Sequence, residues 1–257
     1  MNRLFQASVI ENKNLIKNHY LLTLRPLEKI KKPKPGSFFM VAVANGLDPL
    51  LKRPISIHRW LDGDIQLLYR VAGKGTDILS RKKPGDILEL LGPLGNGFPV
   101  NKTFQNIILV AGGLGIAPIF ALAESLTKKK PTLFYGARTE MEVLCADELN
   151  AIGIDPVIST DDGSSGKKGN IINILKEHIT RNPSFITDHI IFACGPELML
   201  KALSAMAKEC KMKGYAALEQ NMACGIGTCL GCVVKTTKGY KRVCKEGPVF
   251  PIEEIVW

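Results

Sequence analysis

The chain has 257 residues, of which 46% are apolar and 23% charged, and 34 Lys and Arg against 24 Asp and Glu give a formal charge of +10. This composition is ordinary for a globular protein and excludes a disordered, collagen-like or low-complexity chain. The length allows one large or two modest domains with a small appendage. The positive charge points to an acidic partner: nucleic acid, a membrane surface or a phosphorylated cofactor.

The basic residues do not gather into a nucleic-acid patch. The densest runs, residues 29–34 and 128–130, each contain or adjoin a proline and have no interleaved aromatics, which is typical of solvated turns. No apolar run approaches the roughly 20 residues that span a bilayer. Met1 is followed almost at once by an apparent strand, with no signal peptide. We therefore expect a cytoplasmic protein that binds neither nucleic acid nor a membrane.

Residues 1–101 are predicted to fold as a small antiparallel β barrel with Greek-key connections. Short apolar or alternating runs are separated by Pro-Gly, Asn-Gly and Asp-Gly turn signals, which is typical of an all-β unit. Residues 92–99 are rich in glycine and proline and make a natural linker. The predicted strands cover residues 5–10, 20–24, 38–43, 54–58, 65–71 and 87–91.

Residues 102–213 change to a rhythm of strand and helix, which predicts a parallel sheet wrapped by helices. The runs at 107–111 and 190–193 are apolar throughout, as strands covered on both faces are. Residues 214–257 are rich in glycine and cysteine and too few for a core of their own. A metal centre is therefore the leading candidate for what holds this third segment.

The seven cysteines carry the clearest chemical signal. Their odd number does not favour a disulfide framework, and a reducing compartment keeps thiols available as ligands. Four of them fall within 21 positions in the pattern C-x4-C-x2-C, with the fourth after eleven intervening residues. The first three have the spacing of plant-type [2Fe–2S] sites. The predicted cluster ligands are Cys224, Cys229, Cys232 and Cys244.

The glycines of this loop support the same interpretation. Gly225, Gly227 and Gly231 let the backbone approach the cluster sulfurs and point amides at them. The alternative is a zinc site with four cysteine ligands, as in a zinc-binding interaction module, but zinc usually takes two separated pairs. Cys145 and Cys210 lie outside the motif and are expected to be inert apolar residues.

Two glycine turns are candidates for binding nucleotide phosphates. The first, within residues 110–118, follows an apolar strand and opens a helix, so its backbone amides can approach phosphate. Its G-G-x-G spacing is not the usual G-x-G-x-x-G fingerprint. The second, at 194–196, also ends a buried strand. Either turn alone could simply connect a strand to the following helix without binding a ligand. Nucleotide binding is thereby assigned to Gly112, Gly113, Gly115, Cys194, Gly195 and Pro196.

The barrel carries a third set of candidates. An arginine stands before a proline and a serine, an aromatic lies beside a cation, and residues 73–77 form a phosphate-compatible turn. Each is weak alone, since a strand arginine is usually a surface residue and a tyrosine is more often core. Together they describe a site with a stacking ring, two cations and amide donors. The residues are Arg53, Pro54, Ile55, Ser56, Leu68, Tyr69, Arg70, Gly75 and Thr76.

These motifs jointly resemble the ferredoxin–NADP reductase superfamily. With the cysteine block and the Gly-Pro-Val-Phe sequence at 247–250, the chain is similar, over essentially its whole length, to electron-transfer subunits of class 1B dihydroorotate dehydrogenases. The resemblance implies an FAD-binding barrel (1–101), an NAD-binding α/β domain (102–213) and a [2Fe–2S] domain (214–257). The barrel candidates would hold the flavin, and the four cysteines would hold the cluster.

The resemblance also implies a partner, an FMN-containing catalytic subunit that oxidises dihydroorotate in de novo pyrimidine (UMP) biosynthesis, in a heterotetramer of two copies of each subunit. Electrons would pass from the FMN through the cluster and FAD to NAD, and no residue of this chain would be catalytic towards dihydroorotate. Small subunits of related NAD(P)H–ferredoxin or sulfide oxidoreductases share the fold and cofactors and remain alternatives. Arg138 could face a ribose phosphate or simply the surface, which leaves NAD versus NADP open.

Overall fold

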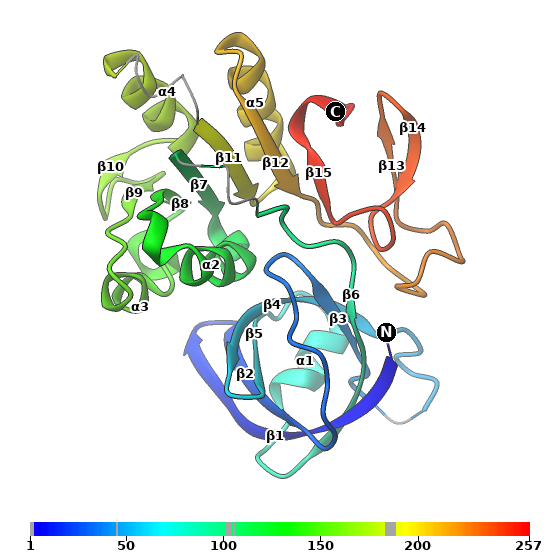
Figure 1. Ribbon diagram of the computed structural model, residues 1–257. Helices are drawn as coiled ribbons and strands as arrows, with labels where there is room; N and C mark the ends of the chain where they lie inside the picture. Colours follow the sequence, from blue (N-terminus) through cyan, green and yellow to red (C-terminus); the bar gives the residue numbers. More distant parts are fainter. Residues whose placement is uncertain (1–2, 45, 101–103, 105, 183–188) are drawn as a thin grey trace.

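The computed structural model describes residues 3–44, 46–100, 104, 106–182 and 189–257, so the predicted boundary between residues 101 and 102 lies outside the described residues. Figure 1 shows a β barrel on one side and a sheet covered by helices on the other, with the C-terminal segment beside both. Among the described helices, none has the length and apolar character needed to cross a membrane.

The N-terminal unit is a closed antiparallel barrel with the strand order β1-β2-β5-β4-β3-β6. Side chains alternate in burial along the strands, so Phe5, Ala7 and Val9 of β1 enter the barrel while their neighbours face outward. The pairing of β2 with β5 and of β3 with β6 joins strands that are not consecutive, which confirms the Greek-key prediction. The elements are β1 (Arg3–Ile16), β2 (His19–Pro26), β3 (Phe38–Val41), β4 (Arg53–Leu61), β5 (Asp64–Arg70), α1 (Lys74–Ser80) and β6 (Ile87–Leu94).

The second unit is built on a sheet with the order β10-β9-β8-β7-β11-β12-β15, parallel except for β15. Its chain order reverses between β7 and β11, where ligands bind in open α/β sheets. The strands are β7 (Asn106–Gly112), β8 (Thr132–Ala137), β9 (Val157–Thr160), β10 (Lys167–Lys168), β11 (His189–Cys194), β12 (Lys213–Ala217) and β15 (Val249–Pro251). The helices are α2 (Ile116–Ser125), α3 (Ala146–Ala151), α4 (Ile171–Arg181) and α5 (Glu197–Glu209).

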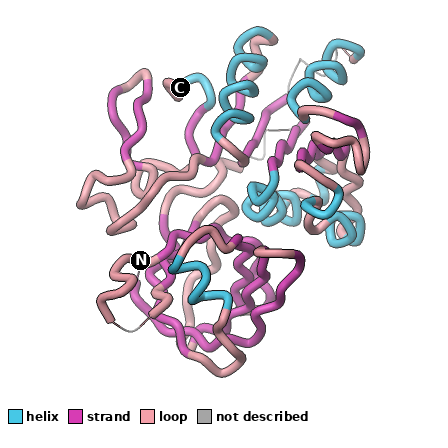
Figure 2. The backbone as a smooth tube through the Cα atoms, turned by 180° about the vertical axis from the view of Figure 1, so that it is seen from behind, coloured by secondary structure: helices cyan, strands magenta, loops and turns pink. Residues whose placement is uncertain are grey.

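The sheet is buried on both faces, as its apolar strands predict. In β7, Ile107 and Leu109 share an apolar core with α2, whereas Ile108 and Val110 share another with α4 and α5. The tube in Figure 2 shows the helices gathered around these strands. A period-two strand with apolar residues at every position must be covered in this way.

The C-terminal segment is attached to the sheet by hydrogen bonds and apolar packing. Strand β15 pairs with β12, and the Leu218 amide donates to the Pro248 carbonyl at 2.9 Å. Val243, Phe250 and Ile252 are buried in the same core as α5. A hairpin of β13 (Val233–Thr236) and β14 (Gly239–Arg242) completes the segment. The segment has no separate core, but shared burial supports it in addition to any metal centre.

A buried histidine lies where the barrel meets α2. His58 of β4 is 2% exposed, and its ring centroid is 4.7 Å from that of Phe120. Beside it, Arg59 donates to Glu124 at 2.6 Å across the same junction. Burial lowers the pKa of His58 to about 4, because the charged ring would lose its hydration.

We expect the chain to lose stability on mild acidification through His58. The unfolded ring has an ordinary pKa near 6.5 and the folded ring a lower one, so this contribution is complete above about pH 6.5 and is lost as the pH falls towards 4. From pH 7 to pH 5, the unfolding free energy of the natural chain should fall by about 2 kcal/mol more than that of His58→Phe. Urea titrations at the two pH values measure the unfolding free energy of each chain. An equal fall in that free energy for the natural chain and for His58→Phe would contradict the prediction.

Candidate functional site

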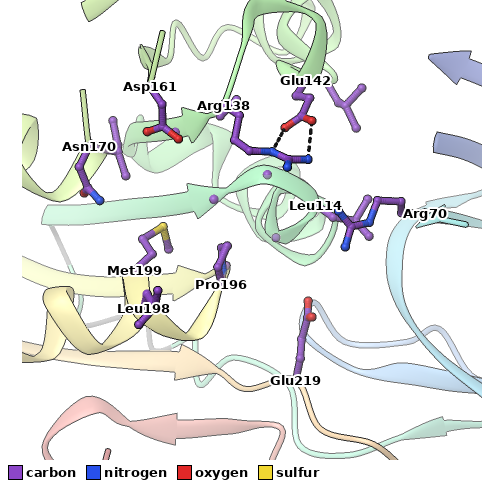
Figure 3. A pocket seen from close by; sticks show the side chains of 18 of the residues that line it. Arg70, Leu114, Arg138, Glu142, Asp161, Asn170, Pro196, Leu198, Met199 and Glu219 are labelled. Carbon is purple, nitrogen blue, oxygen red and sulfur yellow. Dashed lines mark hydrogen bonds and ion pairs between the residues drawn. The ribbon is translucent and has the colours of Figure 1, made fainter. Parts of the chain in front are cut away.

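Two adjoining cavities occupy the crevice between the barrel and the sheet. The first has a volume of about 520 Å³ and lies at the carboxyl ends of β7 and β11 (Figure 3). The second, of about 560 Å³, lies against the barrel. Arg70, Leu114 and Glu219 line both, so ligands in the two cavities would meet at these three residues.

The predicted nucleotide turns come together at the first cavity. Gly112, Gly113, Gly115, Gly195 and Pro196 line it, from the ends of β7 and β11. The first turn ends at the N-terminus of α2, where free amides favour an anion.

The sixth predicted residue of this set, Cys194, is 3% exposed and lies beneath the cavity rather than in its lining. A Cβ on Gly115 would be 2.2 Å from the Cys194 carbonyl oxygen, so only glycine permits the two turns to approach this closely. Burial raises the pKa of the Cys194 thiol well above its usual value, and this keeps the thiol protonated.

The predicted barrel residues gather at the second cavity. Eight of the nine line it: Arg53, Pro54, Ile55, Ser56, Leu68, Tyr69, Arg70 and Thr76. The ninth, Gly75, is buried at the start of α1 and packs against Arg53. A Cβ on Gly75 would be 2.1 Å from Arg53 Nε, so the missing side chain makes room for the guanidinium.

Tyr69 has a hydroxyl that is already bound inside the barrel. The hydroxyl donates to Asn12 Oδ1 at 3.1 Å, and the ring stacks on Tyr20 with centroids 5.6 Å apart. Burial raises the pKa of Tyr69 above its usual value. Tyr69 therefore supplies a wall of the cavity, while its neighbour Arg70 is exposed to it.

Glu219 is a site residue that the sequence analysis did not identify. It follows β12 at the carboxyl edge of the sheet, and its side chain points into the crevice opposite Arg70 (Figure 3). Although it is open to water in the crevice, crowding by the cavity walls raises the pKa of its carboxyl, and Arg70 partly offsets this. A polar residue directly after a buried strand was the available signal.

The four motif cysteines form two pairs in the structure. Cys224 Sγ accepts hydrogen bonds from the amides of Thr228 at 3.4 Å and Cys229 at 3.5 Å. The Cys244 amide donates to Cys232 Sγ at 3.4 Å. Cys229 is exposed, whereas Cys232 and Cys244 are buried.

The surroundings of these thiols fit a [2Fe–2S] cluster. Burial pushes the pKa of Cys224 upward, but amide hydrogen bonds outweigh it and lower the pKa to about 6, so a thiolate is favoured. A two-iron cluster with four cysteines takes two thiolates on each iron, which matches the two pairs. Across the described ranges, no three His, Cys, Asp or Glu side chains are grouped as one metal ion would need.

Arg242 holds the cluster loop in place and was also missed from sequence. Its guanidinium donates to the Gly227 carbonyl at 2.7 Å and to Glu246 at 3.0 Å. Gly225 and Gly227 have φ of +70° and +85°, which disfavours other residues. The Arg242 contact joins β14 to a loop fifteen positions earlier. No local sequence pattern predicts a contact over that separation.

Fold and site together define an oxidoreductase of ferredoxin-reductase architecture with an added iron–sulfur segment. The model for the iron–sulfur cluster binding domain of dihydroorotate dehydrogenase B matches residues 219–256, and that for the oxidoreductase NAD-binding domain matches 109–205. The solved NADH-dependent reduced ferredoxin–NADP oxidoreductase is similar with a TM-score of 0.86 and 26% identity, covering 98% of this chain and 90% of that one. The ferredoxin reductase of carbazole 1,9a-dioxygenase shares the fold, with a TM-score of 0.68 and 20% identity over 82% of this chain and 65% of that one.

Curated relatives give a narrower assignment. The dihydroorotate dehydrogenase B (NAD(+)) electron transfer subunit of Desulforamulus reducens is 38% identical over 265 residues, covering 100% of both chains. That of Clostridium perfringens is also 38% identical, covering 96% of this chain and 95% of the relative. The chain belongs to the family of dihydroorotate dehydrogenase B (NAD(+)) electron transfer subunits.

We expect Gly75→Ala to weaken FAD binding while leaving the fold intact. The added methyl would displace the flexible end of Arg53 rather than backbone, so the unfolding temperature should change little. The displaced cation should weaken FAD binding at least about tenfold.

Gly73→Ala is the matched control for this change. Gly73 has an extended backbone, with φ of 175°, and no atoms lie within 4 Å of an added Cβ. Titration of the flavin-free chain with FAD compares the two variants, and equal affinities would contradict the placement of Arg53.

Proposed function

We propose that this chain carries electrons from the FMN of a dihydroorotate dehydrogenase catalytic subunit, through a [2Fe–2S] cluster and FAD, to NAD⁺ in pyrimidine biosynthesis. The observation that carries the proposal is the meeting of two cavities at Arg70, Leu114 and Glu219. One cavity has the glycine turns of a nucleotide site, and the other has the cations of a flavin site. This arrangement brings the reacting ends of two such ligands together.

FAD, when bound, supplies the exchange between hydride transfer and single-electron transfer. We assign its ring to the wall formed by residues 54–56 and 68–69, and its phosphates to Arg53, Arg70 and the Gly75–Thr76 turn. Arg53 is already oriented by donation to the Leu51 carbonyl at 2.5 Å. Amides of the turn and the two guanidinium groups would offset the charge of the pyrophosphate.

We assign NAD to the first cavity, with its phosphates at the turn of Gly112, Gly113 and Gly115 and its nicotinamide towards residues 194–196. Glu219 then lies where the two ring systems meet, while Arg70 faces the flavin side of this junction. Leu114 shields this meeting point from one side. Because the Cys194 thiol is buried beneath the cavity and protonated, it would support the turn under the ring rather than react with it.

The cluster is assigned to Cys224, Cys229, Cys232 and Cys244. The second cavity extends towards them, since Asn221 and Met222 of the preceding loop line it. Gly225 packs directly on the barrel, where a Cβ would be 2.5 Å from Met40 Cγ. The flavin site and the cluster loop are therefore neighbours, as direct electron transfer requires.

The partner is proposed to be the FMN-containing catalytic subunit, in a heterotetramer of two copies of each chain. The rim of the cluster loop supports docking there: Cys229 is exposed, and the apolar side chains of Ile226 and Leu230 are 49% and 59% exposed. We place the domains at 1–101, 102–213 and 214–257, with β12 (Lys213–Ala217) as the strand of the second sheet that continues across the last of these boundaries. A cytoplasmic location agrees with thiols that must stay reduced before cluster assembly.

Cys229→Ser should remove the cluster without removing NADH oxidation. Serine oxygen is a poorer iron ligand than thiolate, so the visible [2Fe–2S] absorption should fall to background. NADH oxidation with a two-electron dye should stay within about twofold, because it needs the flavin site alone. Cys210→Ser is the control and should keep both. Iron and sulfide absent from the natural chain, with zinc in their place, would overturn the cluster assignment.

Co-expression with the FMN-containing catalytic subunit tests the complete function. The purified complex should form orotate from dihydroorotate with NAD⁺ as the acceptor, and Cys229→Ser should lower this rate at least about a hundredfold while dye reduction by NADH persists. A chain that binds flavin and cluster but never co-purifies with that subunit would favour a related reductase with another partner.

A further inference from the structure

An arginine–glutamate pair forms part of the lining of the first cavity. Arg138 follows β8, and Glu142 lies four residues further on. Arg138 Nε donates to one Glu142 carboxylate oxygen at 3.0 Å, and a terminal nitrogen donates to the other at 2.7 Å. Figure 3 shows this two-point contact at the cavity.

The pair lies in negatively charged surroundings. Asp161 lines the same cavity on the other side of Arg138, and its charge adds to that of Glu142 in holding the guanidinium protonated (Figure 3). The hydrogen bond from Arg138 lowers the pKa of Glu142, so its carboxylate stays ionised near neutral pH. Glu142 and Asp161 outnumber the Arg138 cation, so the immediate surroundings of Arg138 carry a net negative charge.

The pair lies at the position where sheets of this kind distinguish NAD from NADP. In sheets of this kind, an acidic residue after the strand next to the glycine turn accepts a hydrogen bond from the ribose 2′-hydroxyl of NAD, and an arginine there accommodates the 2′-phosphate of NADP. Here β8 is the neighbour of β7, and its end carries both kinds of residue. Which of them is available to a ligand decides the preference.

We propose that Glu142 makes the site selective for NAD over NADP by holding Arg138 in the two-point ion pair. The inference rests on the proposed function, in which the first cavity binds a pyridine dinucleotide. Glu142 engages Nε and one terminal nitrogen of Arg138, so the two-point edge of the guanidinium that would bind a phosphate is already occupied. Glu142 and Asp161 together would repel the two negative charges of a 2′-phosphate, whereas a 2′-hydroxyl donates to a carboxylate without penalty.

Arg138 is able to change partner. Its side chain is 65% exposed, against 24% for Glu142, so the arginine is the mobile member and the glutamate the anchored one. Without the Glu142 charge, the guanidinium could turn into the cavity and bind phosphate in the same two-point geometry. The chain thus carries a latent 2′-phosphate site that its own carboxylate masks.

Glu142→Gln in the full chain tests the proposal by calorimetric titration with ADP and with 2′,5′-ADP, neither of which needs a redox reaction. The variant should bind 2′,5′-ADP at least about tenfold more tightly than the natural chain does, with ADP affinity changed by less than about threefold. The ratio of kcat/KM for NADPH over NADH should rise by the same factor with a dye acceptor. Adding Arg138→Met to Glu142→Gln should abolish both gains.

Three outcomes would overturn the inference or its basis. An unchanged ratio in Glu142→Gln, or a gain that survives Arg138→Met, would remove the role of the pair while leaving NAD binding intact. Failure of the natural chain to bind ADP would remove the nucleotide site and the proposed function with it. Glu142→Ala is a second variant with the same expected direction if Glu142→Gln does not fold. Glu177→Gln breaks the pair of Glu177 with Arg181 on the surface of α4 and should leave every ratio unchanged.

Discussion

The close approach of Gly115 to the backbone of Cys194 governs the rest of the site. A Cβ at position 115 would be 2.2 Å from a carbonyl oxygen, so the ends of β7 and β11 are held together without a side chain between them. The helices that follow, α2 and α5, leave on opposite faces of the sheet, and the crevice opens between their starts. The barrel then packs Leu68 and Phe98 into the α2 core, which brings Arg70 to the same opening.

The C-terminal segment depends on the same sheet. Strand β15 extends it beside β12, and Phe250 is buried against the core of α5, so ordinary packing contributes to the position of the cluster loop. Arg242 fixes that loop by its bond to Gly227. In the proposed assignment, the nucleotide cavity, the flavin cavity, the cluster loop and its exposed rim follow one another as neighbours. Single-electron steps need such an order, because a flavin has to lie between nicotinamide and cluster.

The formal charge of +10 acquires a different meaning in this setting. Flavin and nicotinamide dinucleotides carry anionic phosphates, and a cluster with four thiolates is also negative. Arg53 and Arg70 face the flavin cavity, where those charges would be placed. The distribution is not uniform, because Glu142 and Asp161 make the surroundings of Arg138 in the nucleotide cavity negative. We infer that positive charge serves phosphate binding at Arg53 and Arg70, and that the pairing of Arg138 with Glu142 serves discrimination between dinucleotides.

The sequence by itself determined the barrel strands, the alternation of strand and helix, and the cysteine spacing, because period-two burial and ligand spacing are local properties. It also marked the glycine turns, since close backbone approach needs residues without side chains. Only the tertiary structure decided that Cys194 lies beneath the cavity, that Tyr69 is tied to Asn12, and that Glu219 faces Arg70. It likewise decided that Arg138 is paired rather than free. These outcomes depend on contacts between distant segments and on burial, which no local pattern of residues encodes.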